Sequence, residues 1–396
     1  MTMAEYSALF RRLDAKSPFS SGNDIDPIET KLLPFDIGIP DLSLLPGDDY
    51  ARAAAEVFGG PRFNEAVSYS AYEGITRLRE QVALRRHTNV ENVFITTGAT
   101  QGIFLTISAY VDPGDVVVVE NPTFPFALKA LRLAGADIRT VPTGPRGLDV
   151  DALEELLESG VNVRLVYTVS DFQNPTGVTL SARSKARLLD LAERYDFVIA
   201  ADSPYRDLWF DQPPAEFPQE ERELKDGGHL VEIGSFSKTL GPGWRVGWNI
   251  ADAATVERFA AYRTSAEVHP SGVAQSIVST LLGWDGWYDG LVAKQRETYR
   301  RKAYALYDTL IDVFGADIVV RRPEGGYFLW AQFPERLDPA ADGRRRELAR
   351  RNVRVVQGDS FYPYDTGSRA LRLAFSFLPE EDLIEGSRRI GQSLLG

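Results

Sequence analysis

Short hydrophobic runs alternate with amphipathic segments over most of the chain. The runs are rich in β-branched residues and do not alternate with polar positions, which is typical of strands covered on both faces. They span Val93–Thr96, Val116–Val119, Val163–Val169, Phe197–Ala201, Leu230–Ile233 and Val246–Ile250. The segments between them have helical periodicity and span Ile75–Arg86, Gln101–Tyr110, Ala127–Leu133 and Ala182–Tyr195, with Ser181 as the N-cap of the last. This alternation predicts an α/β fold with a mostly parallel sheet.

The pattern changes near residue 285. A long helix is expected over Leu291–Phe314, followed by a closing series of strands and a final helix. The strands are expected near Tyr327–Gln332, Val353–Val356 and Ala370–Ser376. These elements predict a smaller α+β domain after the larger one. We expect an N-terminal arm and part of the small domain over 1–45, a large domain over 46–285, and a small C-terminal domain over 286–396.

Composition narrows the class of function. The chain has 396 residues and a formal net charge of -12, which disfavours nucleic acid as a partner. It contains no cysteine and only three histidines, which excludes disulfides and thiolate zinc sites and predicts no metal centre. No apolar stretch is long enough to span a membrane, and the first residues do not resemble a signal peptide. We therefore expect a cytoplasmic enzyme without a membrane partner.

Segments that contain glycine, proline and candidate catalytic side chains directly follow the hydrophobic runs. Because the carboxyl ends of parallel strands meet at one edge of an open α/β sheet, that edge is the expected ligand-binding crevice. The segments that would meet there are Gly98–Gly102, Glu120–Phe124, Gln173–Gly177, Asp202–Tyr205 and Ser235–Lys238.

The first of these segments has the features of a phosphate site. Gly98–Gly102 is a glycine-flanked turn into a helix, whose exposed N–H groups and positive end suit an anion. Ser235 and Ser237 would add hydroxyl donors, and Arg245 a planar cation. Two simpler interpretations stay open at this point, namely a tight turn without a ligand and a surface ion pair for Arg245.

Lys238 and Asp202 suggest the chemistry at this edge. A lysine beside an arginine at a sheet edge can have a lowered pKa, and its neutral amine can attack an aldehyde. Asp202 ends a hydrophobic run, so its carboxylate requires a cationic or hydrogen-bonded partner. The alternatives are a solvated surface lysine and a helix N-cap. An aldehyde, a phosphate and a protonated ring nitrogen together describe pyridoxal 5′-phosphate.

At these residues the chain resembles the fold-type I pyridoxal-phosphate aminotransferases of class I/II, and within them the aminoadipate, kynurenine and aromatic or branched-chain subgroup. The most specific segments are Phe172–Gly177, Ser235–Lys238, Pro242–Trp248 and Gly325–Trp330. The resemblance runs from Gly38 to the final helix. It implies a large domain with a mostly parallel seven-stranded sheet, plus a smaller α+β domain.

The resemblance also implies roles for individual residues. Lys238 would carry the internal aldimine and move the proton of the substrate Cα, and Asp202 would pair with the pyridinium nitrogen. Asn174 and Tyr205 would hydrogen-bond the ring O3′ atom and tune the imine. Phe124 would stack on the ring face, where relatives commonly have tyrosine. The phosphate would be held by Ala99, Thr100, Ser235, Ser237 and Arg245.

Substrate and partner contacts follow from the same resemblance. Arg372 matches the arginine that grips the substrate α-carboxylate, for which a planar fork gives orientation through two bonds. An ion pair of Arg372 with Glu380 or Glu381 is the alternative. Tyr69 matches a tyrosine that reaches the phosphate of the neighbouring subunit, which implies a homodimer with shared sites. The expected substrate-binding residues are Gly38, Asn174 and Arg372.

The predicted activity is transfer of an amino group from an L-amino acid to a 2-oxo acid by a ping-pong mechanism, with a specialised biosynthetic substrate. An acidic donor is disfavoured because Ser17–Ser20 lacks the arginine that some dicarboxylate-handling relatives place there. Elimination, decarboxylation or oxidation on the same cofactor is an alternative, since one fold supports several reactions. A cofactor-sensing regulatory module is a further alternative, disfavoured because no helix-turn-helix pattern precedes Gly38. The last alternative is a structural protein that binds no ligand.

Overall fold

The computed structural model describes residues 7–12, 28–218, 228–364 and 366–396. The Ser17–Ser20 segment, on which the expectation about acidic donors was based, lies outside them. Within the described ranges, none of the helices combines the length and the apolar character needed to cross a membrane.

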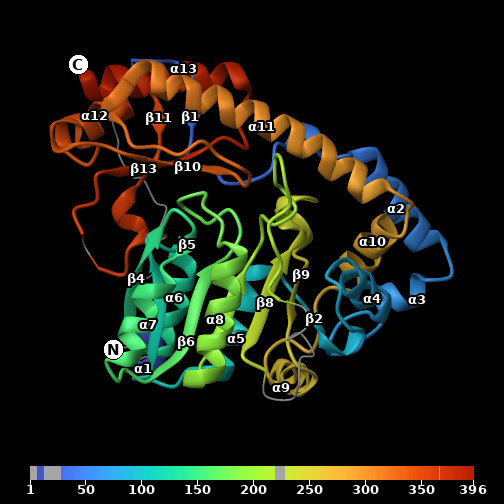
Figure 1. Cartoon of the computed structure of the whole chain (residues 1–396). Coiled ribbons are helices and arrows are strands. Elements are labelled where there is room, and N and C mark those ends of the chain that lie inside the picture. Colours follow the sequence, from blue (N-terminus) through green and yellow to red (C-terminus); the bar gives the residue numbers. More distant parts are fainter. Residues whose placement is uncertain (1–6, 13–27, 219–227, 365) are drawn as a thin grey trace, which may run out of the picture.

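The hydrophobic runs form the main sheet (Figure 1). In spatial order its strands are β2 (Val93–Thr96), β9 (Gly247–Ile250), β8 (Leu230–Ser235), β7 (Val198–Asp202), β6 (Val163–Val169), β3 (Val116–Asn121) and β4 (Asp137–Gly144). The strands from β8 to β4 are parallel, whereas β9 runs antiparallel to both of its neighbours. This is the predicted seven-stranded sheet, and a two-residue strand, β5 (Gly147–Leu148), extends its β4 edge by an eighth.

Helices cover both faces of this sheet. One layer contains α5 (Ala99–Tyr110), α6 (Pro125–Ala134) and α9 (Ala253–Thr264). The other contains α7 (Val150–Glu158) and α8 (Ala182–Tyr195), and the Ser181 hydroxyl caps α8 as predicted by accepting from the Ser184 N–H. Along β3, Val117 packs in the first layer and Val118 in the second. This burial on both faces explains the unbroken hydrophobic runs.

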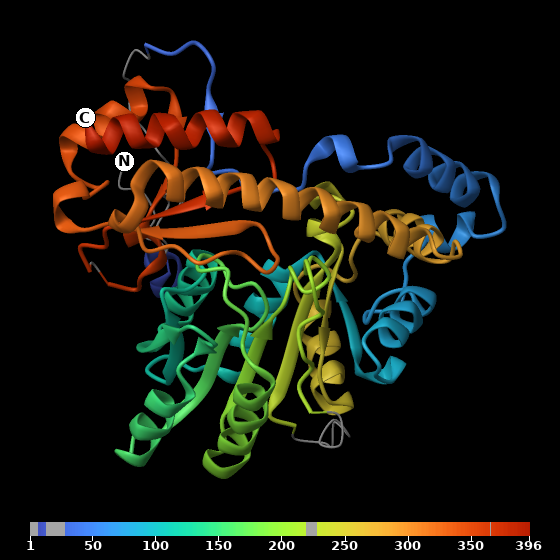
Figure 2. The same cartoon turned by 45° about the horizontal axis from the view of Figure 1, so that its top comes forward.

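A second group of helices lies beside the β2 edge. It consists of α2 (Gly47–Gly59), α3 (Phe63–Val67), α4 (Thr76–Arg85) and α10 (Gly272–Leu282), while the short α1 (Ala8–Arg11) contacts α6. The longest helix, α11 (Trp287–Phe314), runs from this group across to the C-terminal elements, as both views show (Figures 1 and 2). It begins one turn before the predicted Leu291.

The C-terminal elements form a smaller α+β layer. Its sheet contains β10 (Phe328–Gln332), β13 (Ala370–Ala374) and β12 (Val356–Gln357), all antiparallel. Beside it, β1 (Leu33–Pro34) pairs in parallel with β11 (Val353–Arg354), and α12 (Asp342–Arg350) and α13 (Glu380–Leu395) complete the layer. The 3₁₀ helices span Leu42–Leu44, Val90–Asn92, Phe236–Lys238, Pro242–Trp244, Gly315–Asp317, Glu335–Leu337 and Gly358–Phe361.

Candidate active site

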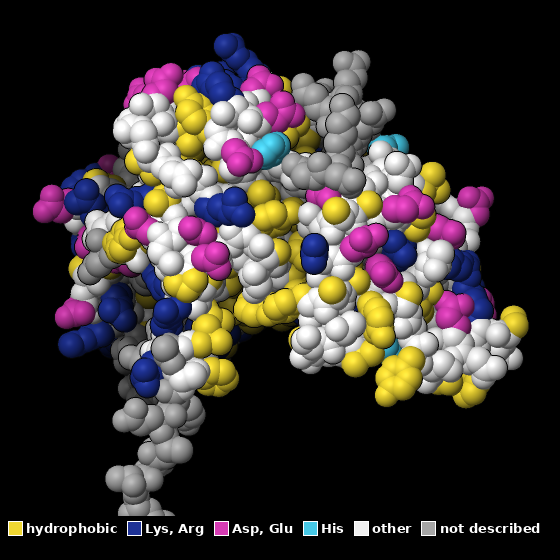
Figure 3. All heavy atoms as spheres, turned by 90° about the horizontal axis from the view of Figure 1, so that it is seen from below, with side chains coloured by type: hydrophobic (Ala, Val, Ile, Leu, Met, Phe, Trp, Pro, Cys, Tyr) yellow, Lys and Arg dark blue, Asp and Glu magenta, His cyan; other side chains and the backbone are white. Residues whose placement is uncertain are grey.

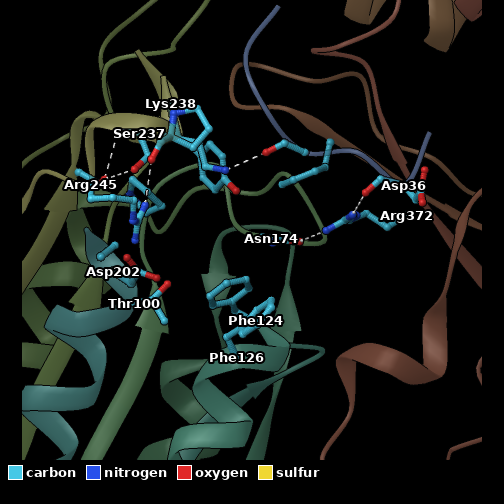
Figure 4. Close-up of a pocket in the computed structure, with 17 residues that line it drawn as sticks. Asp36, Thr100, Phe124, Phe126, Asn174, Asp202, Ser237, Lys238, Arg245 and Arg372 are labelled. Carbon is cyan, nitrogen blue, oxygen red and sulfur yellow. Dashed lines mark hydrogen bonds between the residues drawn. The ribbon is translucent and has the colours of Figure 1, made fainter. Parts of the chain in front are cut away.

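A cavity opens at the carboxyl edge of the main sheet, between this edge and β10 and β13 (Figure 4). It brings together twelve of the thirteen residues expected in the site: Gly38, Ala99, Thr100, Phe124, Asn174, Asp202, Tyr205, Ser235, Ser237, Lys238, Arg245 and Arg372. The exception is Tyr69, which is 87% exposed and contacts the ring of His269 on the surface. The residues predicted from the sequence therefore come together in one cavity from at least six separate segments of the chain.

Lys238 ends the 3₁₀ helix that follows β8, and its side chain enters the cavity. Its Nζ donates a hydrogen bond to the Gly38 carbonyl at 2.8 Å and lies 5.3 Å from the centroid of the Tyr205 ring. Burial lowers the pKa of this amine to about 8, helped by the positive charges of Arg372 and Arg245. Lys238 is therefore not a solvated surface lysine, and an appreciable fraction of its amine is neutral and nucleophilic near neutral pH.

Asp202 ends β7 with a fully buried carboxyl group. Its Oδ2 accepts a hydrogen bond from the Tyr167 hydroxyl at 2.9 Å, whereas its Oδ1 has no hydrogen-bond partner among the described residues. Burial raises the pKa of Asp202 to about 7, and the bond from Tyr167 and the charge of Lys238 oppose this rise. No helix begins at Asp202, so the N-cap interpretation is wrong. A buried oxygen without a partner requires a donor, which a ligand in the cavity can supply.

Gly98 and Arg245 fit together at the start of α5. Gly98 has φ 101°, a backbone conformation that favours glycine, and a Cβ at this position would lie 2.7 Å from Nη2 of Arg245. The Arg245 guanidinium donates to the carbonyls of Thr97 and Pro242. The surface ion pair considered for Arg245 is not found among the residues that the structure describes.

The remaining phosphate candidates surround the same helix end. Ala99 and Thr100 are the first two residues of α5, where the backbone N–H groups have no partner inside the helix. Ser235 and Ser237 face them from the end of β8, with their hydroxyl oxygens 2.8 Å apart. A helix N-terminus, two hydroxyls and a guanidinium form an arrangement suited to binding an anion.

Arg372 lies on β13, on the opposite wall of the cavity. It is almost completely buried, and it donates to Oδ1 of Asn174 at 3.3 Å and to the Asp36 carbonyl at 2.7 Å, not to Glu380 or Glu381. Burial lowers its pKa to about 10, so the guanidinium stays charged at neutral pH. Figure 4 shows it reaching toward Asn174.

Several residues that line the cavity or support its walls were not found from the sequence. Tyr167, which orients the Asp202 carboxylate, sits inside a hydrophobic run, and the need of a buried phenol for a hydrogen-bond partner was a usable signal. Phe126 and Phe328 add aromatic walls, and Asp36 contributes the carbonyl that holds Arg372. These three have no local sequence pattern that separates them from ordinary core or loop residues.

The fold and the site together define a cofactor-dependent enzyme of the fold-type I class. Comparison with protein families is consistent with this, since the model of aminotransferase class I and II matches residues 31–390. The chain belongs to this family. It is 34% identical over 367 residues to the 2-aminoadipate transaminase of Thermus thermophilus, covering 92% of this chain and 90% of the relative.

Two further similarities support the assignment. Aromatic-amino-acid aminotransferase 1 of Thermococcus litoralis is 30% identical over 344 residues, covering 83% of this chain and 80% of the relative. The crystal structure of alpha-aminoadipate aminotransferase from Thermus thermophilus, complexed with N-(5'-phosphopyridoxyl)-L-leucine, matches with a TM-score of 0.85 at 33% identity, covering 92% of both chains. This chain is therefore a pyridoxal-phosphate-dependent aminotransferase.

The residues of the cavity fit this cofactor. Oδ1 of Asp202 accepts no hydrogen bond from any described residue, and the protonated ring nitrogen would provide a donor. The anion-binding arrangement at α5 suits the phosphate, and Lys238 is the amine of the cavity with a lowered pKa.

Proposed function

We propose that this enzyme moves an amino group from an L-amino acid to a 2-oxo acid by a ping-pong mechanism at this cavity. One observation carries the proposal: the amine of Lys238 and the partnerless oxygen of Asp202 line one cavity whose far wall presents the buried Arg372. Bound pyridoxal 5′-phosphate supplies an aldehyde and an electron-accepting ring.

In this proposal each side chain has a defined task. Nζ of Lys238 would hold the aldehyde carbon of the cofactor until the amino group of the substrate takes its place, and the freed amine would then move a proton to and from the substrate Cα. Oδ1 of Asp202 would accept the ring N–H, and the hydrogen bond from the Tyr167 hydroxyl to its other oxygen fixes the carboxylate. The amide oxygen of Asn174 accepts a hydrogen bond from Arg372, so the NH₂ group of Asn174 would be available to donate to the ring O3′ atom. Tyr205 would donate to O3′ as well, and the Phe124 ring would cover one face of the cofactor.

The phosphate would bind between the start of α5 and the end of β8. We assign it to the N–H groups of Ala99 and Thr100, to the two serine hydroxyls and to the exposed Arg245.

Arg372 would hold the α-carboxylate, and the rest of the cavity sets the choice of side chain. Phe124, Phe126 and Phe328 line it, and in the described part of the chain its cations are Lys238, Arg245 and Arg372, all with assigned tasks. This supports a non-acidic donor, such as an aromatic or aliphatic L-amino acid. A specialised biosynthetic substrate stays a prediction.

Amine transfer can be tested with the purified holoenzyme. We expect a panel of L-amino acids incubated with pyruvate or 2-oxoglutarate to give a new amino acid and a new 2-oxo acid in equal amounts, with ¹⁵N passing from donor to acceptor. Chromatography with mass detection measures both products. Release of ammonia, carbon dioxide or peroxide without a new amino acid would instead favour elimination, decarboxylation or oxidation.

We also propose that the enzyme is a homodimer in which Tyr69 completes the partner's phosphate site. Large hydrophobic side chains are exposed along and after α2 and α3, including Phe58, Phe63, Val67, Tyr69 and Tyr72. Seen from below, hydrophobic side chains gather around a notch in the molecular outline (Figure 3). Exposed apolar patches of this kind mark interaction sites. The exposed Arg245 and the distance of Tyr69 from its own cavity are consistent with a second copy covering both.

Hybrid dimers test this sharing. Lys238→Ala and Tyr69→Ala proteins should each lose activity, and mixing them after mild dissociation should restore part of it. The reason is that one site of the hybrid combines Lys238 of one protomer with Tyr69 of the other and is fully wild type. Activity of the mixture against the separate proteins is the measurement. If Tyr69 serves its own chain, no mixture regains activity.

The division into domains also stays a proposal. We place the arm and part of the small domain at 1–45, the large domain at 46–285 and the small domain at 286–396. The parallel pairing of β1 with β11 supports it, as does a core cluster that joins Leu33 and Phe35 to α11, β10, β13 and α13. The expected cytoplasmic location stays a prediction.

A further inference from the structure

We propose that Gln173, held by Glu120, is a positioning residue that locks together the two loops carrying Phe124 and Asn174. The proposal rests on the functions proposed above for these two side chains. Both Glu120 and Gln173 are completely buried, and neither lines the cavity.

Glu120 anchors the pair to the sheet. It is the penultimate residue of β3, and its Oε1 accepts from the Thr168 hydroxyl at 2.8 Å while its Oε2 accepts from the Val169 N–H at 2.9 Å. Both donors belong to the end of the neighbouring strand β6. The same Oε2 also accepts from Nε2 of Gln173 at 3.2 Å. The carboxyl group of Glu120 therefore fixes Gln173 relative to two adjacent strand ends.

Gln173 then bridges the loops that follow those strands. Its Nε2 donates to the Pro122 carbonyl at 2.8 Å, two residues before Phe124. Its Oε1 accepts from the N–H of Thr176 at 2.8 Å and from the Thr176 hydroxyl at 2.6 Å, which closes the turn that contains Asn174. All four hydrogen bonds of the amide are made inside the protein. A buried amide with every bond satisfied defines one geometry, because each lost bond leaves an unpaired polar group.

The consequence concerns both walls of the cavity. Phe124 follows the Pro122 carbonyl as the N-cap of α6, and Asn174 is the direct neighbour of Gln173 and contacts Arg372. A shift of either loop would move Phe124, which is proposed to cover the cofactor ring, relative to Asn174, which is proposed to hydrogen-bond the O3′ atom of that ring. It also moves the Asn174 oxygen away from the Arg372 guanidinium. Gln173 therefore acts on cofactor affinity and on carboxylate recognition without touching either ligand.

The test is Gln173→Met, which keeps the length of the side chain and removes all four amide bonds. We expect the dissociation constant of pyridoxal 5′-phosphate and the KM of the donor each to rise roughly tenfold, together with a shifted visible circular dichroism band of the bound cofactor. The matched control is Asn92→Ala, since the buried Asn92 amide donates to the Ala251 carbonyl outside the cavity. It should lose thermal stability with both constants unchanged. Loss of stability alone in Gln173→Met would overturn the positioning role.

A milder variant covers the case in which Gln173→Met does not fold. Thr176→Val removes one of the bonds to Gln173 at a partly exposed position. It should raise both constants about twofold to threefold, and unchanged constants would overturn the proposal.

A double-mutant cycle separates this proposal from the function on which it rests. If Gln173 acts on carboxylate recognition through Asn174, adding Gln173→Met to Asn174→Ala should raise the donor KM no further. If the two substitutions raise the donor KM additively, the positioning role of Gln173 is overturned and the role of Asn174 stands. Unchanged values in Asn174→Ala by itself would overturn the role proposed for Asn174, and with it this one.

Discussion

Replacing Lys238 with alanine is expected to lower the rate of transamination by at least about 10⁴-fold, because one change removes both the nucleophile and the proton carrier. The remaining lining residues offer no substitute amine, since the other cations of the cavity in the described part of the chain are guanidinium groups. An arginine stays protonated and cannot act as a nucleophile near neutral pH. The loss should therefore appear for every donor.

Spectroscopy distinguishes this chemistry from a general loss of structure. The Lys238→Ala protein should lack the visible absorption of the lysine imine after reconstitution with pyridoxal 5′-phosphate, and reduction with borohydride should leave no mass increase at this position. Lys294→Ala, an exposed site on α11, is the matched control and should keep both signals. A retained imine band in Lys238→Ala would show that another amine binds the aldehyde.

The pKa of Lys238 adds a pH dependence to the same measurement. Burial lowers this pKa to about 8, so the neutral amine fraction rises as the pH increases through that value. Imine formation by the cofactor-free protein should therefore accelerate between about pH 7 and pH 9 and then level off. An ordinary exposed lysine would reach its plateau only above about pH 10.

The main sheet could be predicted because its strands are buried on both faces. Hydrophobic runs such as Val163–Val169 have no solvent side and stand out from the flanking polar residues. The edge strand β4 was not predicted because only Ile138 and Val141 of its eight residues are buried, so it lacks a hydrophobic run. The small strands β11 and β12 are too short, at two residues each, for any pattern to define their ends.

Some features of the site could likewise be predicted from the sequence, whereas others could not. Asp202 and Lys238 could be placed because the residue after a buried parallel strand always reaches the same edge. The contact of Arg372 with Asn174 could not, since it joins residues 198 positions apart and depends on how β13 approaches the main sheet. Glu120 and Gln173 lie within the predicted segments, but their hydrogen bond joins residues 53 positions apart and has no signal in the sequence.

Arg372→Lys is expected to lower kcat/KM by about 100-fold for every α-amino acid, mainly through a higher KM. The guanidinium is buried, and its planar fork can hold both oxygens of a carboxylate, whereas an ammonium offers one point of contact on a flexible stem. The loss should be uniform because all donors, and all 2-oxo acid acceptors, share this carboxylate. Initial rates with an aromatic, an aliphatic and a cationic donor provide the measurement.

The control and the contrary outcome follow from the geometry. Arg301→Lys changes an exposed arginine that pairs with Glu297 on α11, and its kinetic constants should match the wild type. Arg372 also contacts Asn174 and stacks over the Phe328 ring, and a purely structural role would rest on these two contacts. Such a role would lower the melting temperature but leave KM unchanged. A loss confined to one class of donor would instead place Arg372 at the side-chain end of the cavity and move the α-carboxylate elsewhere.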